Sequence, residues 1–110
     1  MSREKQIHDA LQWIERQTHL KTKHARMLSS GDQGRLLQLI SLMIQPKHIL
    51  ELGTFTGYSA VCLSRGLQDG GRLDALEIND ELEDLILEGF RRAGLLLPEE
   101  VERRTEAVFR

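Results

Sequence analysis

The sequence predicts an α/β fold, namely half of a doubly wound parallel sheet preceded by two helices. Two short stretches, residues 47–52 and 72–78, have the length and apolar content of buried strands. Each is followed by a segment whose apolar residues recur at helical spacing, residues 58–66 and 79–93. Strands that alternate with helices form parallel sheets through right-handed crossovers, so we expect a sheet of about three parallel strands.

The first expected helix covers residues 3–18, where Ile7, Leu11 and Ile14 share one face. The stretch that follows, residues 18–26, is polar and basic and has no clear periodicity. We interpret it as a solvated linker, and a lip over a substrate pocket is the alternative interpretation.

The second expected helix covers residues 32–45 and carries a broad apolar stripe. Ser30 or Asp32 can cap its start, because both side chains accept hydrogen bonds from free backbone N–H groups. Pro46 ends it, because proline disfavours the helical conformation in the residue before it.

The expected helix over residues 79–93 has the clearest end signals. Asn79 is a suitable N-cap, acidic residues fill the first turn, and two arginines precede Gly94 at the other end. This order of charges complements the helix dipole, and glycine often ends a helix. A third strand is expected to begin near Val101, although its hydrophobic pattern is weak.

The composition describes one small domain of 110 residues. Its net charge of −2 argues against nucleic acid or an anionic membrane as a partner. The most apolar stretch, residues 36–44, is too short to cross a bilayer. With a single cysteine, Cys62, and no apolar signal core near the N-terminus, a cytoplasmic location is expected.

A glycine loop follows the first expected strand, in the segment ELGTFTGYSA at residues 51–60. Gly53 and Gly57 lie between a strand and a helix N-terminus, where backbone N–H groups favour an anion. A dinucleotide fingerprint would require G-x-G-x-x-G, but the bulky Phe55 lies close to the position of its middle glycine. No Gly-Lys-Ser/Thr follows, which excludes a P-loop.

Two carboxylates at the strand ends narrow the choice of ligand. Glu51 beside the loop would repel a pyrophosphate and attract an ammonium or sulfonium group. Glu77 ends the second expected strand, where an acid can accept hydrogen bonds from ribose hydroxyls. Together with amides for a carboxylate, these groups describe a site for S-adenosylmethionine. The alternative is an ordinary turn flanked by solvated acids.

ELGTFTGYSA, followed by ALEINDEL, resembles motif I and the following acid of the cation-dependent, catechol O-methyltransferase-like family. The upstream stretch MLSSGDQGRLLQLI is similar to the family's segment before its first strand, and the resemblance covers residues 27–94. It implies a Rossmann-like class I methyltransferase fold and methyl transfer from S-adenosylmethionine to a hydroxyl of a small molecule. On this basis residues 1–46 form an N-terminal helical segment, and residues 47–110 form the first half of the cofactor-binding domain.

The resemblance also implies a set of cofactor-binding residues. Glu51, Gly53 and Thr54 would line the methionine part of the cofactor. Glu77 would hold the ribose, and Ile78 would lie beside the adenine. Ordinary core packing is the alternative role for the two aromatic members. The complete set is Ser29, Glu51, Gly53, Thr54, Phe55, Gly57, Tyr58, Ser59, Glu77 and Ile78.

The sequence departs from the family in two respects. Family members are longer, and their divalent-metal ligands and general base lie in the second half of the chain. We therefore assign no catalytic residue and no metal ligand here, we interpret His48 as structural or solvated, and we expect a metal such as Mg²⁺ only in a full-length member. The segment 105–107 matches the family's adenine-contacting turn only loosely.

Three functions remain open from the sequence. The first is an S-adenosylmethionine-dependent O-methyltransferase, represented by its cofactor-binding half. The second is a non-catalytic module that binds this cofactor or a protein partner. The third, an NAD-binding domain, is disfavoured by Glu51 and by the missing fingerprint. Because the first strand is central in the complete sheet of the family, we also expect it to form an exposed edge here and to promote self-association.

Overall fold

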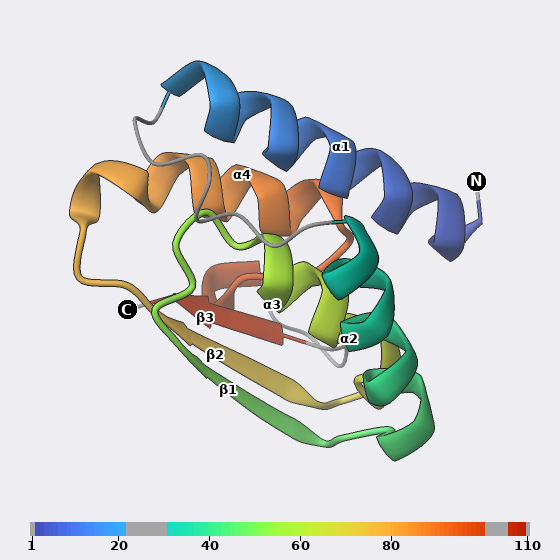
Figure 1. Cartoon of the computed structure of the whole chain (residues 1–110). Coiled ribbons are helices and arrows are strands. Elements are labelled where there is room, and N and C mark those ends of the chain that lie inside the picture. Colours follow the sequence, from blue (N-terminus) through green and yellow to red (C-terminus); the bar gives the residue numbers. More distant parts are fainter. Residues whose placement is uncertain (1, 22–30, 101–105, 110) are drawn as a thin grey trace.

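The computed structural model describes residues 2–21, 31–100 and 106–109, and its three strands form one parallel sheet in the order β1-β2-β3 (Figure 1). This arrangement, with two helices before the first strand, confirms the predicted fold class. In chain order the elements are α1 (Arg3–Lys21), α2 (Gly31–Ile44), β1 (His48–Leu52), α3 (Tyr58–Leu63), η2 (Ser64–Gly66), β2 (Arg72–Leu76), η3 (Asp80–Leu82), α4 (Glu83–Arg92), η4 (Pro98–Glu100) and β3 (Glu106–Phe109).

The four α-helices of the described residues lie on one face of the sheet (Figure 1). On the side that faces them, Leu73 and Ala75 of β2 and Ala107 of β3 are fully buried, whereas Ile49 and Glu51 of β1 are half-buried. On the opposite face, by contrast, Leu50 is 62% exposed and Leu52 is 72% exposed. The predicted strand is therefore present, but it is half-buried on one face and exposed on the other rather than buried. Parallel sheets are usually covered on both faces, and among the described residues helices cover one of them.

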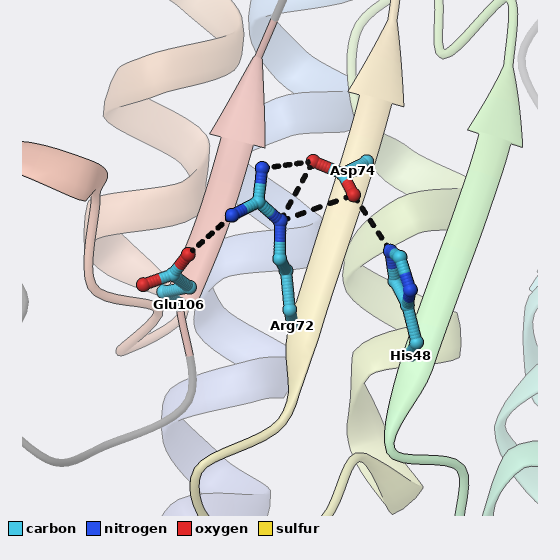
Figure 2. Close-up of polar contacts among 4 residues, drawn as sticks. All are labelled: His48, Arg72, Asp74 and Glu106. Atoms are coloured by element: carbon cyan, nitrogen blue, oxygen red, sulfur yellow. Dashed lines mark hydrogen bonds and ion pairs between the residues drawn. The ribbon is translucent and has the colours of Figure 1, made fainter.

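A network of charged side chains ties the three strands together on this open face (Figure 2). His48 Nε2 on β1 lies 2.6 Å from Asp74 Oδ2 on β2, which agrees with a structural role for this histidine. Arg72 donates to Asp74 at 3.1 Å and to Glu106 on β3 at 3.0 Å. Hydrogen bonds from the Arg72 guanidinium hold the pKa of Asp74 below its usual value. The network reinforces the strand register.

Helix α1 packs along α4 and supplies part of the core. The side chains of Ile7 and Ile14 are buried there together with Phe90 of α4. Gly89 allows the close approach, because a Cβ at that position would lie 2.9 Å from Ile14. The Arg92 guanidinium lies 4.4 Å from the centre of the Trp13 ring, which adds a cation–π contact at the edge of this interface.

Two helices differ from the sequence prediction. Helix α1 continues to Lys21 rather than ending at residue 18, because its buried face extends to Thr18, which is fully buried and donates a hydrogen bond to the carbonyl of Ile14. The part of the linker prediction that covers residues 22–26 lies outside the described residues.

Helix α2 begins at Gly31, so Asp32 lies inside its first turn and does not cap it, and Ser30 lies outside the described residues. Its buried side carries the small residues Gly34 and Ser41, because the α2 backbone approaches α3 and η2 closely. Much of the apolar stripe therefore faces outward. In the predicted stripe Leu37 is half-buried, and the exposed members are Leu36, Ile40, Met43 and Ile44; Leu39 and Leu42 beside the stripe are exposed as well.

The second half of the chain follows the prediction with shifted boundaries. Asn79 accepts a hydrogen bond from the N–H of Glu81, as expected of an N-cap, but it opens the short helix η3 ahead of α4. Strand β2 ends at Leu76, which leaves the two predicted site residues after it in the following loop. The start predicted near Val101 lies outside the described residues, and the described strand begins at Glu106.

No helix in the described part of the chain combines the length and the apolar character that a membrane crossing requires. The loose match of residues 105–107 to the family's adenine-contacting turn does not correspond to a turn at its last two residues. Glu106 and Ala107 belong to β3 itself and pair with β2.

Candidate functional site

The loop between β1 and α3 is a tight turn fixed by backbone hydrogen bonds. The N–H groups of Gly53 and Thr54 both donate to the carbonyl of Leu76 at the end of β2, at 2.8 and 2.9 Å. The N–H of Gly57 donates to the carbonyl of Thr54 at 2.9 Å. Three residues of the loop have positive φ angles, namely Gly53 at 71°, Phe55 at 53° and Gly57 at 86°. This conformation is unusual for a bulky residue such as phenylalanine.

The two glycines of the loop meet different surroundings. A Cβ at Gly57 would lie 3.1 Å from the ring of Phe90, so this end of the loop presses on the core. A Cβ at Gly53 would have no atom within 4 Å. The loop is thus anchored at its helix end and has free space beside the strand end, which is where a ligand can approach the backbone.

Glu77 connects this loop to the loop after β2. Its Oε1 accepts a hydrogen bond from the N–H of Phe55 at 2.8 Å, and its Oε2 accepts one from the N–H of Asn79 at 3.1 Å. Each carboxylate oxygen has a second lone pair, so two further donors can be accepted. The carboxylate that the sequence places at a strand end therefore lies directly against the glycine loop.

Glu51 is held from α3. The hydroxyl of Ser59 donates to Glu51 Oε2. The other oxygen, Oε1, is buried and has no hydrogen-bond partner among the described residues, and the same holds for the hydroxyl oxygen of Thr54. Buried polar atoms are nearly always paired in folded proteins. Two unpaired oxygens close to the glycine loop therefore indicate a place where a ligand supplies hydrogen-bond donors.

The predicted residues outside this group have other surroundings. Tyr58 is buried and packs near Gly34 of α2, and its burial raises the pKa of the phenol. Ile78 is fully exposed in the loop after β2. Ser29 lies outside the described residues. Phe55 is half-buried and packs on the core. Of the predicted set, the structure brings together Glu51, Gly53, Thr54, Phe55, Gly57, Ser59 and Glu77.

Two residues near the site were not identified from the sequence. Thr56 in the loop and Thr18 on α1 are both fully buried, and their hydroxyl oxygens lie 3.0 Å apart. No local pattern marks this pair, because its members are separated by 38 positions along the chain. Only the helical spacing of Thr18 from Ile7 and Ile14 places it on the buried face of α1.

Neither a metal site nor a reactive thiol is evident in the described part of the chain. Among residues 2–21, 31–100 and 106–109, no group of three or more His, Cys, Asp or Glu side chains could hold a metal ion. Burial raises the pKa of the Cys62 thiol to about 12, so this cysteine is protonated at neutral pH and is a poor nucleophile.

The fold and the loops define an α/β protein of the Rossmann-like class, with the glycine loop, Glu51 and Glu77 at the carboxyl ends of its parallel strands. The model of the O-methyltransferase family matches residues 1–105. The chain belongs to this O-methyltransferase family.

Curated relatives align with part of the chain. A catechol O-methyltransferase of Niastella koreensis is 42% identical over 66 residues, which are 60% of this chain and 30% of the relative. A caffeoyl-CoA O-methyltransferase of Petunia hybrida is 36% identical over 69 residues, which are 63% of this chain and 28% of the relative. The aligned part is therefore under a third of the length of these relatives.

Solved structures match nearly the whole chain. The O-methyltransferase TomG from Streptomyces achromogenes, in complex with SAM, superposes with a TM-score of 0.73 at 30% identity. That match covers 91% of this chain and 42% of TomG. An O-methyltransferase from Bacillus cereus, in complex with SAH, gives a TM-score of 0.66 at 30% identity. That match covers 96% of this chain and 43% of the Bacillus cereus chain.

Proposed function

We propose that the chain is the cofactor-binding half of an S-adenosylmethionine-dependent O-methyltransferase that acts on a hydroxyl of a small molecule. The observation that carries the proposal is the buried Oε1 of Glu51, which has no hydrogen-bond partner in the described part of the chain and lies next to the open side of Gly53. This carboxylate oxygen needs a hydrogen-bond donor, and a cationic ammonium group is the donor it would bind most strongly.

The other groups of the site suit the same cofactor. Glu77 has lone pairs free for two ribose hydroxyls, and it is already held in place by the amides of Phe55 and Asn79. The bound cofactor supplies a sulfonium methyl group for an in-line displacement. The residues of this chain would contribute orientation, because a site that positions the donor lowers the entropic part of the barrier.

Calorimetric titration tests this proposal. We expect heat of binding with S-adenosylhomocysteine and none with NAD. Replacing Glu51 by glutamine should weaken S-adenosylhomocysteine binding about tenfold, because a charge-assisted hydrogen bond becomes a neutral one. Glu83→Gln, an exposed residue of α4, is the matched control and should bind like the unaltered chain. A folded sample that gives no heat with S-adenosylhomocysteine would contradict the proposal.

A second candidate function is a non-catalytic module that binds the cofactor or a partner subunit. The aligned part covers 30% of the catechol O-methyltransferase relative, so methyl transfer by this chain is tested separately from cofactor binding. Catechol and caffeoyl-CoA, offered as acceptors with Mg²⁺ and S-adenosylmethionine, distinguish the two candidates. Cofactor binding without methyl transfer to either acceptor would favour the module.

We also propose that two copies of the chain associate through β1. Among the described residues this strand pairs with β2 on one side only, so its outer edge presents free N–H and C=O groups. Leu50 and Leu52 of this strand are exposed, and the outward-facing apolar stripe of α2 adds further exposed apolar surface. An apolar strand edge favours pairing with an identical edge about a two-fold axis.

Sedimentation velocity measures this association, and we expect a dimer at micromolar concentrations. Leu52→Lys should shift the protein toward monomer by placing a charge on the edge strand. Leu20→Lys is the matched control, because Leu20 on α1 is also 72% exposed but lies away from β1. A monomer throughout the concentration range, or equal behaviour of the two variants, would contradict the proposal.

A further inference from the structure

Helix α1 reaches the glycine loop through one buried pair of hydroxyl groups. Thr18 lies near the C-terminal end of α1, and Thr56 lies in the loop between Phe55 and Gly57. Both threonines are fully buried, and their hydroxyl oxygens are 3.0 Å apart. Because both are buried, water cannot replace this contact without a change in the packing.

The direction of the hydrogen bonds follows from the neighbouring carbonyl group. Thr18 Oγ1 lies 2.6 Å from the carbonyl oxygen of Ile14, which can only accept. The single hydroxyl proton of Thr18 therefore points to Ile14, so the Thr56 hydroxyl is the donor in the contact between the two threonines. The chain of donors runs from Thr56 to Thr18 and on to Ile14.

This contact is one of three that hold the loop from different sides. The amides of Gly53 and Thr54 are tied to β2, and the amide of Phe55 is tied to Glu77. Thr56 is the member of the loop that is tied to α1. Phe55, next to it, has a φ of 53°, a strained conformation that persists only where the surroundings hold it.

Helix α1 is held in the core by its packing against α4, so it can support the glycine loop. Ile14, one turn before Thr18, is fully buried and packs against Gly89 of α4. The carbonyl that accepts the Thr18 proton thus belongs to a residue fixed in the core. A displacement of α1 would move Thr18 and remove the acceptor of Thr56.

We infer that Thr18 is a positioning residue for the cofactor loop, which it holds in its binding conformation through Thr56. The inference rests on the proposed function, since the affected property is the affinity for the cofactor. It assigns to the N-terminal helix a part in the site, although α1 contributes no residue to the predicted set of cofactor contacts.

Thr18→Val removes the hydroxyl and nearly conserves the shape of the side chain. We expect the affinity for S-adenosylhomocysteine to fall about tenfold, because the Thr56 hydroxyl loses its buried acceptor and the loop loses one support. The amides of Phe55 and Gly57 should exchange their hydrogens faster than in the unaltered chain. Thr18→Ser, which keeps the hydroxyl, should restore both properties.

Ser64→Ala is the matched control for the loss of a buried hydroxyl. Ser64 is fully buried and its hydroxyl donates to the carbonyl of Val61 at 2.6 Å, and within residues 2–21, 31–100 and 106–109 this hydroxyl makes no hydrogen bond to the loop. We expect this variant to lose a similar amount of stability and to keep the cofactor affinity and the exchange rates of the loop. Equal effects of Thr18→Val and Ser64→Ala on the loop would overturn the inference.

The loop can also be tested from its other end and without cofactor. Thr56→Val should reproduce the effects of Thr18→Val, and the double variant should be no worse than either single one, because all three lack the same contact. If the losses of affinity of the two single variants add up in the double variant, the inference is contradicted. If Thr18→Val does not fold, Thr56→Val alone tests the contact. If the unaltered chain binds no S-adenosylhomocysteine, the proposed function fails, while hydrogen exchange still decides whether Thr18 supports the loop.

Discussion

Glu77→Ala should weaken S-adenosylhomocysteine binding about 100-fold in a calorimetric titration. The variant loses the two hydrogen bonds proposed for the ribose, each worth about 1.5 kcal/mol or more to a charged acceptor. It also leaves the amides of Phe55 and Asn79 without their present partner, so the two loops of the site are no longer joined. Both effects act in the same direction.

Two further variants separate these contributions. Glu77→Gln keeps one oxygen acceptor and should fall between the unaltered chain and the alanine variant. Glu81→Ala removes an exposed carboxylate four residues along the chain and should leave the affinity unchanged. An affinity of Glu77→Ala equal to that of Glu81→Ala, with both variants folded, would refute the ribose role.

Gly66→Ala should be the most destabilising of the small substitutions considered for this chain. A Cβ at Gly66 would lie 2.0 Å from the carbonyl oxygen of Ser41, an impossible distance, so α2 and η2 would have to move apart. The separation would also break the hydrogen bond of 2.9 Å from the Gly66 N–H to the Ser41 hydroxyl. We expect a loss of about 3–5 kcal/mol, which is a large part of the stability of a typical domain.

Urea unfolding followed by circular dichroism measures this loss. Gly31→Ala at the start of α2 is the control, because a Cβ there would meet no atom within 4 Å. That variant should stay within about 0.5 kcal/mol of the unaltered chain. If the two alanine variants unfold at the same urea concentration, the close contact between α2 and η2 does not contribute as described.

Local signals predicted the part of the fold that surrounds the site. The apolar stretches located β1 and β2, and the glycine loop lies where the sequence placed it. Asn79 was identified as a cap because its side chain acts on a residue two positions away. The proximity of Glu77 to the loop followed from a general property of parallel sheets, whose carboxyl ends share one edge.

Features that depend on contacts far apart in the sequence were not predictable in this way. The continuation of α1 beyond residue 18 depends on burial of a polar side chain, which a hydrophobic pattern does not reveal. The outward orientation of the α2 stripe arises because Gly34 and Ser41 permit a closer backbone approach than the large apolar residues would. Strand β3 has only four residues and carries little pattern of its own.

The cation–π contact between α1 and α4 contains the intrinsic fluorophore of the protein, Trp13. Trp13 is the single tryptophan of the chain, and its ring lies under Arg92 at the interface of the two helices. Intrinsic fluorescence excited at the indole band therefore originates from one place, the interface between α4 and α1, the helix that supports the glycine loop. Detachment of α1 can be followed by this emission while circular dichroism follows the backbone of the whole chain, so the two signals together resolve whether the helix leaves before the sheet unfolds.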